Sequence, residues 1–177
     1  MSAESPVNWY DEAELLRIEA ARPQNTKTGS VAAFLDMLAH AEGTRRFGRE
    51  DGYDVMVGGK TFDSYHDHPR QSVWLPAYGI RSTAAGRYQF LVGTWDDLVA
   101  RFGLTDFSPV NQDLGAVHLI RQCKALTLIH DGRIREAIHA CRRIWASLPG
   151  AGYGQRELAT AELLQVYHDA GGVSVDS

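Results

Sequence analysis

One acidic residue, Glu42, falls where the sequence otherwise predicts a buried helix face. Apolar residues recur with the spacing of an amphipathic helix, at Val31, Phe34, Leu35 and Leu38. Glu42 follows about three turns after Val31, so it lies on the same face. Burial and the partial negative charge of a helix C-terminus both raise the pKa of a carboxyl group, as a general acid requires near neutral pH. The spacing alone leaves open that the helix ends at Ala41 and that Glu42 faces water.

The elements around Glu42 predict an α+β fold that is mainly helical with a small β-hairpin lobe. Ser30 is suited to cap the first helix and Gly43 to end it. The run Val55 to Phe62, with Gly58 and Gly59 at its centre, predicts two short strands around a tight turn. Further helices are expected near 94–102, 110–129, 133–147 and 156–170. This order places Glu42 beside a β-lobe, with a groove between the lobes.

Several side chains that follow Glu42 are suited to binding sugars, because tyrosine rings offer apolar faces and carboxylates and amides hydrogen-bond hydroxyl groups. Taken singly, each is more commonly a core, capping or surface residue. The candidates for substrate binding are Asp54, Tyr88, Gln89, Tyr153 and Gln155.

Composition and charge exclude some classes of function. The 177 residues are 44% hydrophobic and 23% charged, which is typical of a globular domain. Residues 1–30 are expected to form an N-terminal extension and linker, and residues 31–177 a single domain that acts as a monomer. No membrane-spanning segment and no secretory signal is expected. A net charge of −4 argues against a general nucleic-acid binder. Cys123 and Cys141 are interpreted as reduced thiols.

A metal site is the weaker alternative. His66 and His68 lie close to Asp63 and Asp67, but two histidines two residues apart in a loop lack the helical spacing of a common zinc site. Pro69 indicates a turn in which the histidines serve as structural hydrogen-bonding groups. No metal and no other cofactor is therefore expected.

A set of longer blocks carries a family resemblance; they are residues 34–39, 42–44, 52–55, 57–59, 67–70, 85–89, 106–109 and 144–155. In this order they resemble the lambda-type phage endolysins, a lysozyme-like family of lytic transglycosylases. The similarity spans about residues 33–172. Two departures from the family are a shorter segment between Glu42 and Gly52, and Asp51 in place of a histidine.

The resemblance implies an enzyme that cleaves the MurNAc-GlcNAc bond of peptidoglycan strands, with Glu42 as the catalytic acid and 1,6-anhydro-MurNAc as the product. It also implies that the enzyme waits in the host cytoplasm and reaches the wall through a holin pore. Two other functions stay open. A hydrolytic muramidase would use Asp54 or Asp51 as a second carboxylate. A wall-binding module would hold glycan strands without catalysis.

Overall fold

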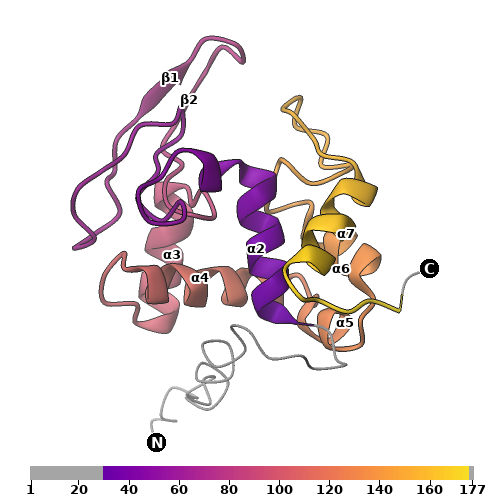
Figure 1. The fold of residues 1–177 in the computed structure, drawn as a ribbon. Helices are drawn as coiled ribbons and strands as arrows, with labels where there is room; N and C mark the ends of the chain where they lie inside the picture. Colours follow the sequence, from indigo (N-terminus) through magenta and orange to yellow (C-terminus); the bar gives the residue numbers. More distant parts are fainter. Residues whose placement is uncertain (1–29, 176–177) are drawn as a thin grey trace, which may run out of the picture.

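The computed structural model describes residues 30–175, and its architecture is built around one central helix (Figure 1). Helix α2, Val31–Glu42, lies between α3 (Val92–Phe102) and α4 (Pro109–Gln122) on one side and α5 (Leu126–His130), α6 (Ile134–Cys141) and α7 (Thr160–Asp169) on the other. It packs against α4, α5 and α7. The predicted extension lies outside the described residues, apart from Ser30.

Helix α2 is more deeply buried than the predicted amphipathic pattern indicates. Its apolar residues between Ala32 and Ala41 are buried on every side, as expected of a helix at the centre of a domain. The predicted ends are confirmed. The Ser30 side chain accepts a hydrogen bond from the backbone of Ala33, and Gly43 ends the helix with a φ of 74°. Glu42 is therefore the last residue of the helix, and the alternative end at Ala41 is wrong.

The small β-sheet lies later in the chain than predicted. Strands β1, Val73–Leu75, and β2, Ile80–Ser82, pair in antiparallel register with Trp74 opposite Arg81, and they form a hairpin that projects from the helices (Figure 1). The predicted hairpin around Gly58 and Gly59 contains only an isolated bridge between Val55 and Thr61. The α+β class is confirmed, but the position of its hairpin is corrected.

Three of the predicted helices are shorter or divided. The predicted helix 110–129 breaks between α4 and α5, where Lys124 has a φ of 59°. The predicted helix 133–147 ends at Cys141 and continues as turns, and α7 begins at Thr160. These turns leave the segment around Ser147 free of helical geometry and close to the end of α2. A short 3₁₀ helix, η1 (Thr44–Arg46), follows α2 directly.

Candidate active site

A pocket with a volume of about 420 Å³ lies at the C-terminal end of α2. Its walls come from the end of α2 and η1, the turn around Gly58, the turn between β1 and β2, and the segment that precedes α7. The lining residues are Ala41, Glu42, Gly43, Thr44, Phe47, Val55, Met56, Val57, Gly58, Gly59, Tyr78, Gln89, Ser147, Gln155 and Arg156.

Glu42 is the carboxylate of this pocket. No other acidic side chain among the described residues lines it. Burial raises the pKa of Glu42 from 4.5 to about 7, because an ionised carboxylate loses solvation, while a hydrogen bond from Ser147 lowers the pKa in part. A carboxyl group with this pKa is protonated in a large fraction of molecules near neutral pH. It can therefore donate a proton and take one back.

Ser147 holds the Glu42 carboxylate in place. Its hydroxyl donates a hydrogen bond of 2.6 Å to Oε1 of Glu42 from a position 105 residues further along the chain. Ser147 is buried, and its carbonyl oxygen accepts a hydrogen bond of 2.9 Å from the backbone of Leu158. Nearby, the buried ring of Trp145 donates to the carbonyl oxygen of Tyr88 at 3.1 Å. The Glu42 carboxylate thus has a partner that is itself fixed by the core.

The chain turns sharply after Glu42, and Thr44 stabilises this turn. The buried hydroxyl of Thr44 lies 3.2 Å from the carbonyl oxygen of Ala39 and 2.8 Å from that of Arg87. Gly52 packs directly against Thr44. It has a φ of 91°, and a Cβ there would approach Thr44 to 2.9 Å. Glycine at 52 is therefore required both by its backbone conformation and by this contact.

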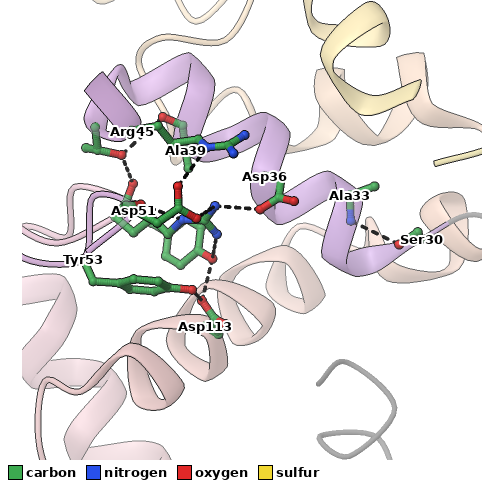
Figure 2. A network of polar contacts seen from close by, with 11 residues as sticks. Ser30, Ala33, Asp36, Ala39, Arg45, Asp51, Tyr53 and Asp113 are labelled. Atoms are coloured by element: carbon green, nitrogen blue, oxygen red, sulfur yellow. Dashed lines mark hydrogen bonds and ion pairs between the residues drawn. The ribbon is translucent and has the colours of Figure 1, made fainter. Parts of the chain in front are cut away.

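A buried guanidinium connects α2 to the segment that carries Gly52. Arg87 is fully buried and pairs with Asp36 of α2 at 2.6 Å and with Asp51 at 2.9 Å. Arg45 also pairs with Asp51, at 3.0 Å. Figure 2 shows this network between Asp36 on α2 and Asp113 on α4. A buried charge is tolerated only when it is paired in this way, so the network fixes the segment that carries Gly52 against α2.

Two of the five predicted substrate-binding residues lie away from the pocket. Asp54 is buried and accepts hydrogen bonds from the backbone and side chain of Arg49. Tyr88 is also buried, and its hydroxyl donates to Asp113 at 2.6 Å. Burial, together with the charge of Asp113, raises the pKa of Tyr88, so it remains a neutral donor. Both side chains support neighbouring segments rather than facing the pocket.

Of the other three predicted residues, two line the pocket. Gln89 and Gln155 line it, although the amide of Gln89 also donates to the carbonyl oxygen of Gly86 at 2.9 Å. Tyr153 is not among the lining residues. Its ring is exposed, and its hydroxyl donates to the carbonyl oxygen of Arg143 at 3.0 Å.

Sequence reasoning missed three residues that shape the site: Ser147, Phe47 and Arg156. Phe47 is exposed and lies over Gly59, so it forms an apolar wall. Ser147 belongs to the resembling block 144–155, and Arg156 directly follows it. That block was the one available signal for both, but nothing in their local pattern indicates a site.

Of the two histidines in the metal alternative, His68 has structural hydrogen-bond partners for both of its ring nitrogens. Nδ1 of His68 accepts a hydrogen bond from the backbone of Arg70 at 3.0 Å, so its Nε2 carries the proton and donates to the carbonyl oxygen of Phe90 at 2.9 Å. Within residues 30–175, no cluster of three potential metal ligands is found. Cys123 and Cys141 are free thiols.

Comparison with solved structures identifies the fold class of the protein. The fold is that of a lysozyme. The structure of bacteriophage lambda lysozyme in complex with a chitohexasaccharide matches with a TM-score of 0.78 and 49% identity, over 81% of this chain and 95% of that chain. A second structure of lysozyme from bacteriophage lambda matches with a TM-score of 0.75 and 48% identity, over the same shares of the two chains.

The sequence comparisons define the family. The endolysin of Escherichia phage lambda is 51% identical over 143 residues, which cover 79% of this chain and 90% of that protein. The endolysin of Escherichia phage P2 is 48% identical over 155 residues, which cover 81% and 94%. The family model for endolysins matches residues 32–174, and the chain belongs to the endolysin family. It is a peptidoglycan-degrading enzyme. No helix among the described residues is long and apolar enough to span a membrane.

Proposed function

We propose that this endolysin is a lytic transglycosylase, which cleaves the β-1,4 bond between MurNAc and GlcNAc and leaves 1,6-anhydro-MurNAc ends. The observation that carries the proposal is a single carboxylate, Glu42, with a pKa of about 7 in a pocket that no other described acidic residue lines. Glycosidases with two catalytic carboxylates need them about 5 to 9.5 Å apart across the scissile bond. A site with one carboxylate needs a nucleophile from the substrate.

The nucleophile in this mechanism is the C6 hydroxyl of the muramic acid itself. Glu42 donates its proton to the departing glycosidic oxygen as the bond from C1 to that oxygen breaks. The resulting carboxylate then takes the proton of the C6 hydroxyl as O6 bonds to C1, which closes the anhydro ring and restores the acid. Intramolecular attack has a high effective molarity, so an activated water is not required. Ser147 orients the carboxylate during both proton transfers.

The surroundings of Asp51 and Asp54 support this mechanism over a hydrolytic muramidase. Asp54 is buried against Arg49, and Asp51 pairs with Arg45 and Arg87. Neither acid lines the pocket with Glu42. A second carboxylate held by ion pairs outside the pocket is poorly placed to activate a water molecule.

The sugar contacts are proposed for the polar residues of the pocket. Gln89 and Gln155 line it and are suited to hydrogen-bond sugar hydroxyls, and Tyr153 offers an exposed ring to a longer glycan strand. Asp54 and Tyr88 have supporting roles. The chitohexasaccharide held by lambda lysozyme is consistent with a glycan strand as the substrate. The remaining proposals are that the enzyme acts as a monomer and reaches the wall from the host cytoplasm through a holin pore.

Substitution of the three acids tests the proposal. Glu42→Gln keeps the size and hydrogen bonding of the side chain but cannot cycle a proton, so the lytic rate should fall by at least about 100-fold while glycan binding persists. Asp51→Asn and Asp54→Asn should each cost much less. A loss for either that equals the loss for Glu42→Gln in a folded protein would favour the hydrolytic mechanism. Unchanged lysis by Glu42→Gln would favour a non-catalytic wall-binding module.

A further inference from the structure

Two charged side chains, Glu42 and Arg156, line the pocket among the residues that the structure describes. Glu42 is largely neutral below its pKa of about 7. The Arg156 guanidinium carries a positive charge. A substrate in the pocket therefore meets one cationic group.

Arg156 is available to a ligand because its neighbouring acid is already engaged. The Glu157 carboxylate accepts hydrogen bonds of 2.8 Å from the backbone of both Gly150 and Gly152. These bonds lower the pKa of Glu157 and keep it ionised. Between residues 30 and 175, no carboxylate forms an ion pair with Arg156, which is exposed on the pocket wall.

The backbone places Arg156 near the catalytic acid. Leu158 is buried, and its backbone donates to the carbonyl oxygen of Ser147, the residue whose hydroxyl contacts Glu42. Arg156 is two residues before this anchor. Burial and the Ser147 hydrogen bond account for the pKa of Glu42 without a contribution from Arg156. Arg156 thus lies at the site without tuning its acid.

We infer that Arg156 binds a carboxylate of the peptide stem that the muramic acid carries, and so distinguishes stem-bearing murein from an uncharged glycan. This inference rests on the proposed function. A planar guanidinium binds a carboxylate through two parallel hydrogen bonds, whereas chitin-like sugars have no anionic group for it. In intact murein the lactyl carboxyl of MurNAc forms an amide bond with the peptide stem and carries no charge. The nearest free carboxylates therefore belong to the stem.

The test uses soluble, uncross-linked murein strands in two forms, with native stems and with the stem carboxyls converted to amides. Arg156→Gln should lower kcat/KM about fivefold on native strands, the size expected for a solvent-accessible charge pair. Wild type should lose a similar factor on the amidated strands, and Arg156→Gln should lose nothing further there. Arg156→Lys should recover only part of the loss, since it cannot bind in a bidentate manner.

Arg143→Gln is the matched control, because Arg143 is exposed close by but does not line the pocket. It should behave as wild type on both substrates. Equal losses for Arg156→Gln on native and amidated strands, or no loss on either, would overturn the inference. The chemical form of the product ends, measured in the same digests, tests the transglycosylase proposal separately.

Discussion

Replacing Glu42 by glutamine should stabilise the folded protein at alkaline pH, although it removes the proposed catalytic acid. Burial holds the pKa of Glu42 at about 7 in the folded protein, against 4.5 for the free side chain. At about 1.4 kcal/mol per pKa unit, ionising Glu42 costs the native state on the order of 3 kcal/mol. Glu42 retains some contact with solvent at the pocket, so we expect about 2 kcal/mol.

Because the pKa of Glu42 is higher in the folded protein than in the free side chain, ionisation of Glu42 lowers the stability of the folded protein. The wild-type protein has its full stability below about pH 4.5, loses it as the pH rises toward 7, and then levels off. Glutamine is neutral throughout and still accepts the Ser147 hydrogen bond. Urea unfolding should therefore show Glu42→Gln more stable than wild type at pH 8 and equal to it at pH 4. Asp131→Asn, at an exposed acid outside the pocket, should show no such difference. Equal stability of wild type and Glu42→Gln at pH 8 would refute the assigned burial.

Three further predictions concern the support of the site. Ser147→Ala removes a hydrogen bond to ionised Glu42, so the pKa of Glu42 should rise by about one unit. The alkaline limb of the pH–rate profile should move to higher pH by the same amount. An unchanged alkaline limb would contradict the role of Ser147 in stabilising the carboxylate. Arg87→Met leaves Asp36 and Asp51 without their buried partner, so the free energy of unfolding measured by denaturant titration should fall by about 3 kcal/mol. A loss under ~1 kcal/mol would show that the network is dispensable. A chain that begins at Gly29 should keep most of its lytic rate on purified murein, and a folded chain that loses over ~90% would place the extension in the site.

The helix that carries Glu42 could be predicted because its signals are local. Ser30 and Gly43 supply end signals within one turn, and the apolar spacing marks the face between them.

The hairpin could not be placed from sequence. Its strands are three residues long, and Trp74 and Ile80 are exposed, so no alternation of buried and exposed residues marks them. The break after α4 was missed for a similar reason, since Lys124 adopts a positive φ without a glycine or proline nearby.

The residues of the candidate site also differ in whether a local sequence pattern indicates them. Glu42 is identified by its place on the helix, whereas Ser147 reaches it from 105 residues away, which no local pattern encodes. Asp54 and Tyr88 were chosen for their chemical type, but type does not reveal that Arg49 and Asp113 already bind them. Side-chain direction depends on tertiary packing, so residues of the right chemistry can support a pocket without facing it.

The central claim is that the C6 hydroxyl of the substrate, and not water, attacks C1 when Glu42 has donated its proton. Digestion of murein in water enriched with heavy oxygen tests this directly, because a hydrolytic product takes one oxygen atom from the solvent. The account predicts that mass spectrometry will find muropeptides with unlabelled 1,6-anhydro-MurNAc ends. Labelled reducing ends would show that water is the nucleophile and would contradict it.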